Sequence, residues 1–271
     1  MPLAVCATPI GNLEDVTLRV LRELTEADVV LCEDTRHTRV LLDRHGVRAR
    51  ELVSYHRHNE ARRTAEVLER LGHGQRVALV SDAGLPAVSD PGTRLVAAAL
   101  DAGLPVTVLP GPSAVATALV ASGLASERYQ FLGYLPRTDK AREALWNELA
   151  RWPYTAIAFE SPKRLPVSLA SLARGLPARR VAVCRELTKR FEEVVLGSAE
   201  EVAARFTEPP KGEITVVLGA AAVERSGELR DAVVSVGELV GEGVPRRRAV
   251  ELVARLTGVP RNELYRESLS S

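Results

Sequence analysis

Short β-branched runs that each stop at a turn rich in glycine and proline are the feature that most constrains this chain. The run Val77–Val80 ends in the turn Ser81–Gly84, which puts the carboxylate of Asp82 at the tip of a buried strand. The runs Leu3–Ala7 and Val106–Leu109 end in similar turns. Ligands of open α/β sheets collect beyond the carboxyl ends of the strands. The three turns are therefore predicted to line one small-molecule site.

Segments with helical character separate these strands along the first two-thirds of the chain. Thr17 precedes a segment with helical apolar spacing, and Ser113 is expected to cap a helix over Ala114–Ala121. Asp90 and Pro91 are expected to open another helix as its cap and its first-turn proline. This alternation of strands and helices predicts the α/β class, with mostly parallel strands.

The strands of the second half follow one another more closely. Val181–Cys184 and Glu192–Leu196 have no helix between them, which predicts an antiparallel pair and hence a mixed sheet. We expect an N-terminal α/β domain over residues 1–112, a second α/β domain over 113–222, and a small helical module over 230–271.

The helical module is expected to follow a linker, Ala220–Leu229, and to resemble a helix-turn-helix. Val250, Val253 and Leu256 are expected to share one helical face. Gly258 is expected to end that helix.

The composition excludes several classes of function. The 36 Lys and Arg residues nearly balance 35 Asp and Glu residues, so the overall charge does not favour nucleic acid. Cys6, Cys32 and Cys184 lie far apart in apolar runs, which predicts buried thiols and neither disulfides nor a zinc site. No apolar run approaches the ~20 residues that span a bilayer, and no signal peptide is predicted. We expect a cytoplasmic protein with no metal and no membrane partner.

Nine short motifs occur in an order that resembles a known family. They are Thr8–Leu13, Cys32–Arg36, Ser81–Gly84, Ser89–Gly92, Leu109–Ser113, Phe131–Tyr134, Glu160–Arg164, Cys184–Lys189 and Lys211–Glu213. The set resembles the tetrapyrrole (precorrin) methylase superfamily, and within it the bacterial enzymes that methylate a cytidine 2′-hydroxyl of 16S ribosomal RNA. Precorrin enzymes carry a Gly-x-Gly-x-Gly-Asp-like first loop, whereas this chain has Pro9–Asn12, which favours the RNA branch.

The resemblance implies two α/β domains with S-adenosyl-L-methionine in the cleft between them. It also implies a homodimer that methylates 16S ribosomal RNA, or the small ribosomal subunit, without a metal. The positions expected to contact the cofactor are Ile10, Gly11, Asp82, Gly84, Leu85, Ser113, Ala114, Phe159, Cys184 and Ile214. A tetrapyrrole methyltransferase and a non-catalytic RNA assembly factor that binds the methyl donor are the alternatives.

Charged residues at strand ends are the candidates for catalysis and for RNA contact. Glu33, Lys163 and Arg185 are the candidates for moving the hydroxyl proton. The segment around Glu33 fits a structural ion network equally well. The residues expected to contact RNA are Arg36, His56, Arg164, Lys189, Arg246, Arg247 and Arg248, although each fits a solvated surface charge as well.

Overall fold

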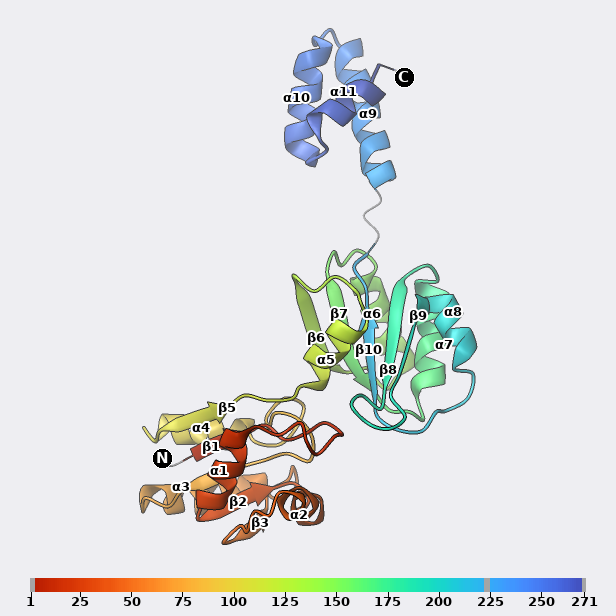
Figure 1. Ribbon diagram of the computed structural model, residues 1–271. Helices are drawn as coiled ribbons and strands as arrows, with labels where there is room; N and C mark the ends of the chain where they lie inside the picture. The colour runs from red at the N-terminus through yellow and green to blue at the C-terminus, as the bar shows by residue number, and fades with distance from the viewer. Residues whose placement is uncertain (1–2, 222–224, 270–271) are drawn as a thin grey trace. The chain divides into compact units, whose positions relative to one another are not determined.

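The computed structural model describes residues 3–221 and 225–269 and contains two compact units, Met1–Ala221 and Ala222–Ser271 (Figure 1). Positions 222–224 of the expected linker and positions 270–271 of the expected module lie outside the described residues. In the described part of the chain, no helix is long and apolar enough to cross a membrane. The finer division of the first unit at residue 112 stays a prediction.

The first sheet of the larger unit is parallel throughout. Its strands are β1 (Leu3–Cys6), β2 (Val29–Cys32), β3 (Leu52–Ser54), β4 (Val77–Leu79) and β5 (Val106–Leu109), in the order β3-β2-β4-β1-β5. Since β4, β1 and β5 are neighbours, the turns that follow them emerge side by side at one edge. The expected parallel α/β arrangement is confirmed.

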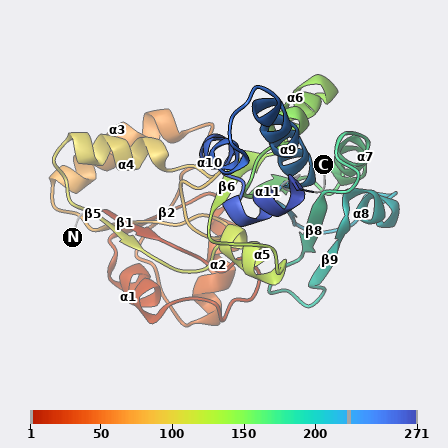
Figure 2. The ribbon, with the colours of Figure 1, turned by 90° about the horizontal axis from the view of Figure 1, so that it is seen from above.

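Helices cover both faces of this sheet, as Figure 2 shows. The helices α1 (Leu18–Glu26) and α2 (Thr35–Arg44) lie on one face, and α3 (Glu60–Gly72) and α4 (Thr93–Asp101) lie on the other. Strand β1 shows why, because its side chains alternate between the two cores. Leu3 and Val5 pack with the α3 and α4 side, whereas Ala4 and Cys6 pack with the α1 and α2 side.

Helix starts were predicted correctly at two of three places. The Thr17 hydroxyl accepts a hydrogen bond from the amide of Val20 and caps α1. The expected start at Asp90 and Pro91 is wrong, because α4 begins at Thr93. Its N-cap is Gly92, with φ 134°, and a Cβ there would lie 2.9 Å from Leu79 Cδ2. The backbone at Gly92 thus packs against Leu79 in a conformation that only glycine adopts easily, and α4 begins at the next residue.

The second sheet is mixed, as expected. Its strands are β6 (Tyr129–Tyr134), β7 (Thr155–Glu160), β8 (Arg180–Arg185), β9 (Glu193–Ser198) and β10 (Ile214–Leu218), in the order β6-β7-β10-β8-β9. Only β6 and β7 pair in parallel, and the remaining pairs are antiparallel. The pair β8–β9 is the antiparallel pair that the short connection predicted.

The two faces of the second sheet are covered differently (Figure 1). The helices α6 (Asp139–Leu149), α7 (Leu165–Gly175) and α8 (Ala199–Arg205) pack on one face. The other face carries α5 (Ala114–Ala121), which Ser113 caps as predicted. Ile10 from the turn after β1 is buried in this second core beside Cys184 and Val217. A loop of the first half therefore completes the core of the second half.

The smaller unit is a three-helix cluster of α9 (Arg225–Gly241), α10 (Arg246–Thr257) and α11 (Arg261–Glu267) in its described residues. Gly258 ends α10 in the left-handed conformation, as predicted. The expected linker is wrong in part, because helix α9 begins at Arg225, within it. On the expected face of α10, Val250 and Val253 are buried and Leu256 is 81% exposed. Leu256 lies about 120° around the helix from the buried Val250, so it leaves the apolar stripe that Val250 shares with Val253.

Candidate active site

Hydrogen bonds lock the turn after β4 to the turn after β1. The amide of Thr8 donates to the carbonyl of Gly84 at 2.8 Å, and the amide of Gly84 donates back to the carbonyl of Thr8 at 3.1 Å. The Thr8 hydroxyl donates to the carbonyl of Ser81 at 3.0 Å. Gly84 has φ 79°, which favours glycine. The two turns therefore hold one shape, from which Asp82 projects.

A cavity of about 320 Å³ lies beside these turns, and we call it the Thr8 cavity. Its walls are partly apolar and partly charged. The apolar residues are Ile10, Leu13, Val40 and Leu41, and the charged or ionisable ones are His37, Asp82, Lys189 and Glu213. Its size lies within the ~300–1,000 Å³ typical of small-molecule sites.

The carboxylate of Asp82 contacts two protein groups and is partly exposed to solvent. Its Oδ1 accepts a hydrogen bond from the amide of Asp34 at 3.1 Å, and its Oδ2 lies 3.5 Å from Nδ1 of His37. The side chain is 32% exposed. A carboxylate has about four lone-pair sites, so acceptor capacity remains for a ligand.

Residues 187–189, in the second half of the larger unit, contact the loop after β1. The amide of Asn12 donates to Thr188 Oγ1 at 3.0 Å. A Cβ on Gly11 would lie 2.5 Å from Lys189 Cγ and 2.8 Å from the carbonyl oxygen of Leu187. Thr188 has φ 65°, a strained conformation for a β-branched residue. Gly11 is thus placed where no side chain fits.

Lys189 is neutralised by two carboxylates. Its Nζ donates to Glu186 and Glu213, both at 2.9 Å. Burial lowers the pKa of Lys189, but these hydrogen bonds outweigh the effect of burial and the pKa is raised. Lys189 therefore stays protonated. Its ammonium group lies at the Thr8 cavity and is already paired with both acids in this structure.

Glu33 and Asp34, the two acids that follow β2, have different surroundings. Asp34 accepts hydrogen bonds from the side chain and the amide of Arg36, which lower its pKa, and this is the ion network that the sequence left open. Glu33 stays outside that network. Burial raises the pKa of Glu33, and the charge of Asp82 raises it further. In the described residues, no three His, Cys, Asp or Glu side chains are placed to hold a metal ion.

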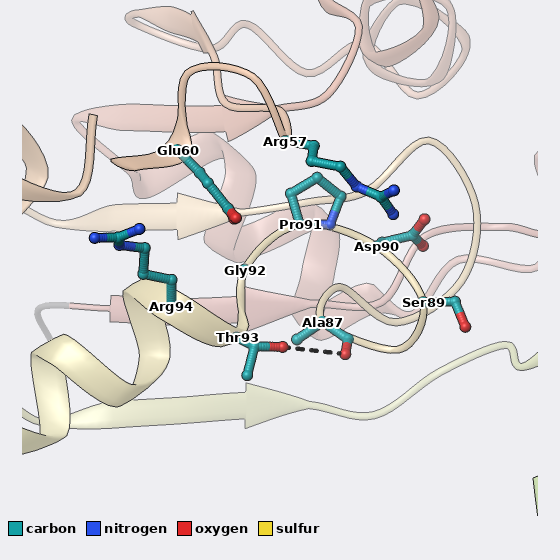
Figure 3. Close-up of a pocket in the computed structure, with 9 residues that line it drawn as sticks. All are labelled: Arg57, Glu60, Ala87, Ser89, Asp90, Pro91, Gly92, Thr93 and Arg94. Carbon is teal, nitrogen blue, oxygen red and sulfur yellow. Dashed lines mark hydrogen bonds between the residues drawn. The ribbon is translucent and has the colours of Figure 1, made fainter. Parts of the chain in front are cut away.

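A second cavity, of about 580 Å³, lies between the loop after β3 and the loop after β4, and we call it the Asp90 cavity (Figure 3). Arg57 lines it from the first loop and Asp90 from the second, while Glu60 and Arg94 line it from the first turns of α3 and α4. Burial raises the pKa of Asp90 to about 6, with further contributions from the charges of Glu33 and Asp82. The sequence favoured a helix cap over a ligand contact for Asp90, because Asp-Pro is typical of a helix start. The following glycine was the signal against that interpretation.

The expected cofactor positions divide between the walls and the packing beneath them. Ile10, Gly11 and Asp82 line the Thr8 cavity, and Gly84 fixes its turn. Ala114, Phe159 and Cys184 pack around Ile10, Leu85 packs on the first core, and Ser113 caps α5. Ile214 belongs to the core on the α6–α8 face, so only its backbone faces the Ile10 side. Whether these residues contact a cofactor stays a prediction.

The other two candidates for catalysis have less suitable surroundings than Glu33. Lys163 is exposed and makes no hydrogen bond or ion pair with another described residue. The guanidinium of Arg185 is committed to Glu193, at 2.9 Å, and to the carbonyl of Lys211.

The residues expected to contact RNA are distributed over both units. Arg36 is 87% exposed in its pair with Asp34, and His56 lies against Asn59. Arg164 forms an ion pair with Glu160, whose side chain is fully buried. The guanidinium group of Arg164 therefore balances the charge of that acid. In the smaller unit, Arg246 donates to the carbonyl of Ser268, Arg247 is exposed, and Arg248 pairs with Glu251.

Comparisons with known proteins agree with this architecture. Residues 2–203 match the family model of the Tetrapyrrole (Corrin/Porphyrin) Methylases. The Ribosomal RNA small subunit methyltransferase I of Mesorhizobium japonicum is 45% identical over 270 residues, which cover 98% of this chain and 91% of the relative. The protein of the same name from Halalkalibacterium halodurans is 41% identical over 274 residues, covering 97% and 93%. A uroporphyrin-III-C-methyltransferase structure from Thermus thermophilus matches with a TM-score of 0.56 and 24% identity, covering 83% of this chain and 97% of that chain, which supports a shared fold.

Proposed function

The chain belongs to the tetrapyrrole methylase family, and on that premise we propose that it methylates a cytidine 2′-hydroxyl of 16S ribosomal RNA with S-adenosyl-L-methionine as donor. The observation that carries the proposal is the 45% identity, over almost the whole chain, to a relative named for methylation of small-subunit ribosomal RNA. We expect the enzyme to act as a homodimer in the cytoplasm, where ribosomal subunits are found.

The residues of the Thr8 cavity fit this methyl donor. Asp82 offers a free acceptor for amino or hydroxyl groups, and Ile10 and Leu41 offer apolar surface. Gly11 lets the backbone approach a ligand closely. When bound, the donor supplies a methyl group on a positively charged sulfur, and the carboxylates nearby favour that charge.

For methyl transfer, the main contribution of the protein is to align the ribose oxygen with the methyl group of the donor. Holding the ribose oxygen in line with the donor contributes up to ~7–11 kcal/mol to lowering the barrier in favourable cases. A carboxylate with a raised pKa is a better proton acceptor, and Glu33 is the candidate whose surroundings produce that shift. We assign to Glu33 the acceptance of the hydroxyl proton, which contributes a factor of about 10²–10⁴ in rate.

The smaller unit is proposed to hold the RNA backbone. Helix α10 begins with Arg246, Arg247 and Arg248, and the side chains of Arg247 and Arg248 are exposed. Contacts of this kind position RNA by its phosphates and carry no sequence information.

One incubation tests the function. Methyl-labelled donor is offered with free 16S ribosomal RNA, with assembled small subunits, and with a tetrapyrrole. Label in RNA supports the proposal, and digestion to nucleosides must then show a 2′-O-methylcytidine. Label in the tetrapyrrole, or donor binding without any transfer, contradicts it.

Asp82→Ala tests the assignment of the donor site. The variant removes the open carboxylate of the Thr8 cavity, so we expect donor affinity to fall at least about tenfold, the equivalent of ~1.4 kcal/mol. Isothermal calorimetry measures it, and native affinity contradicts the assignment.

A further inference from the structure

We propose that the Asp90 cavity receives the base of the nucleotide to be methylated, and that Asp90 and Arg57 recognise the base by its hydrogen-bonding edge. The inference rests on the proposed function and adds to it a residue that distinguishes cytosine from uracil. A cavity of about 580 Å³ has room for a base extruded from a single-stranded region, which is how proteins usually read RNA sequence.

Three charged groups of this cavity lack protein partners among the described residues. Asp90 is half-buried, yet its carboxylate makes no hydrogen bond or ion pair with another described residue. The same holds for the guanidinium groups of Arg57 and Arg94. Removing a carboxylate from water without a hydrogen bond costs free energy, and a ligand with a suitable donor offsets that cost. Figure 3 shows Arg57 and Asp90 extending toward the same side of the cavity.

The charges around the cavity oppose a phosphate group. Glu60 lines the same wall as Arg57, and the charges of Glu33 and Asp82 act on Asp90 strongly enough to contribute to its raised pKa. An anion in the cavity would meet the carboxylates of Glu60 and Asp90, which line it. A neutral ring with donors and acceptors along one edge fits both the acid and the arginine.

The Asp90 cavity lies close to the Thr8 cavity. Glu213, which lines the Thr8 cavity, acts electrostatically on Asp90 and also on Tyr134. Tyr134 is 61% exposed and close enough for Asp90 to act on it too. Its ring offers a surface on which an extruded base stacks. We therefore place the base in the Asp90 cavity and the methyl donor in the Thr8 cavity, with the ribose between them.

The loop that carries Asp90 is held in an unusual shape. Ala87 and Ser89 have φ of 71° and 67°, although neither is glycine. The Thr93 hydroxyl donates to the carbonyl of Ala87 at 3.4 Å, and the amide of Ala87 donates to the carbonyl of Pro91 at 3.3 Å. Such strain persists only where surrounding contacts enforce it. The position of Asp90 is therefore set before a ligand arrives.

The chemistry of an ionised carboxylate gives the selectivity. It only accepts hydrogen bonds, so Asp90 pairs with the exocyclic amine of cytosine and repels the O4 oxygen of uracil at the same place. Arg57 only donates, which suits the O2 oxygen of a pyrimidine.

The test compares assembled small subunits that carry cytidine or uridine at the methylated position. Transfer is measured at about pH 8, where Asp90 with a pKa of about 6 is ionised. We expect the wild-type chain to prefer cytidine by at least about tenfold in kcat/KM. Asp90→Asn should reduce the preference below about threefold, because an amide donates and accepts and can turn to face either base. Asp101→Asn makes the same change of charge on an exposed residue at the end of α4 and should keep the preference.

Thermal unfolding and donor calorimetry accompany each variant, so that a folding defect is recognised. An unchanged preference in a folded Asp90→Asn variant overturns the inference and leaves the proposed function standing. An equal loss of activity on both substrates also overturns it. If the wild-type chain transfers no methyl group to either RNA, the proposed function fails and this inference fails with it.

Discussion

A single added methyl group at Gly11 tests how the two halves of the larger unit are joined. Gly11 does not have a positive φ, so alanine meets no backbone strain there, and the whole effect is steric. The new Cβ would lie 2.5 Å from Lys189 Cγ, 2.7 Å from Thr188 Oγ1 and 2.8 Å from the carbonyl oxygen of Leu187. One of the three atoms belongs to the backbone, so a side-chain rotation alone cannot relieve the contact.

The magnitude follows from two effects. Overpacking costs ~1–3 kcal/mol, and the hydrogen bond from the amide of Asn12 to Thr188, which is solvent-exposed, adds ~0.5 kcal/mol when it is lost. We expect Gly11→Ala to lower the free energy of unfolding by about 2 kcal/mol, which corresponds to a fall in Tm of about 4–8 °C for a unit of this size. Because Gly11 also lines the Thr8 cavity, donor affinity should fall by about tenfold, the equivalent of ~1.4 kcal/mol.

Urea unfolding and donor calorimetry measure the two effects on the same preparation. Gly72→Ala is the matched control, because a Cβ at Gly72, the last residue of α3, meets nothing within 4 Å. The control should be neutral or gain up to ~1 kcal/mol from the helix propensity of alanine. If Gly11→Ala unfolds and binds donor as the wild-type chain does, the loop contact does not align the two halves and the reasoning fails.

Three further predictions follow from contacts described above. Arg164→Ala should lower the free energy of unfolding by about 3 kcal/mol, because the fully buried Glu160 loses its counter-charge and keeps only its hydrogen bonds from Ser161 and Ser168. Arg36→Ala should cause no measurable change, and equal effects of the two variants in urea unfolding would contradict this. The transfer rate should rise with pH through the raised pKa of Glu33, since only its ionised form accepts a proton. Glu33→Gln should lower the rate at least about 100-fold and remove that rise. A pH profile that the substitution leaves unchanged would rule out Glu33 as the proton acceptor. Deleting residues 222–271 should weaken RNA binding and flatten its salt dependence without changing donor affinity, and an unaltered salt slope would show that α10 does not hold phosphates.

The parts of the fold that depend on neighbouring residues were predictable from the sequence. The caps Thr17 and Ser113 act within three residues of themselves, and the β8–β9 pair follows from a short connection. Both signals are local, so they do not depend on how distant segments pack. The error at Asp90 has a different origin, because Gly92 is required by contact with Leu79, a residue of another element.

The candidate site was less predictable because its groups come from distant segments. Lys189 was expected to contact RNA, and the sequence did not show that Glu213, 24 residues further along the chain, forms an ion pair with it. Asp34 and Glu33 are adjacent in sequence and differ in their surroundings, because only Asp34 forms an ion pair with Arg36. A sequence shows which charges are available, whereas the pairing depends on tertiary distances.

The burial of Ile10 in the second core has a consequence for biosynthesis. A ribosome makes residues 1–112 before residues 113–221, so the loop that carries Ile10 already exists when β10 leaves the exit tunnel. A fragment of residues 113–221 made alone would lack that loop, and the core that contains Cys184 and Val217 would lose Ile10. It should therefore aggregate, and supplying residues 1–112 from a second messenger should rescue it only if the two polypeptides meet before the fragment is lost.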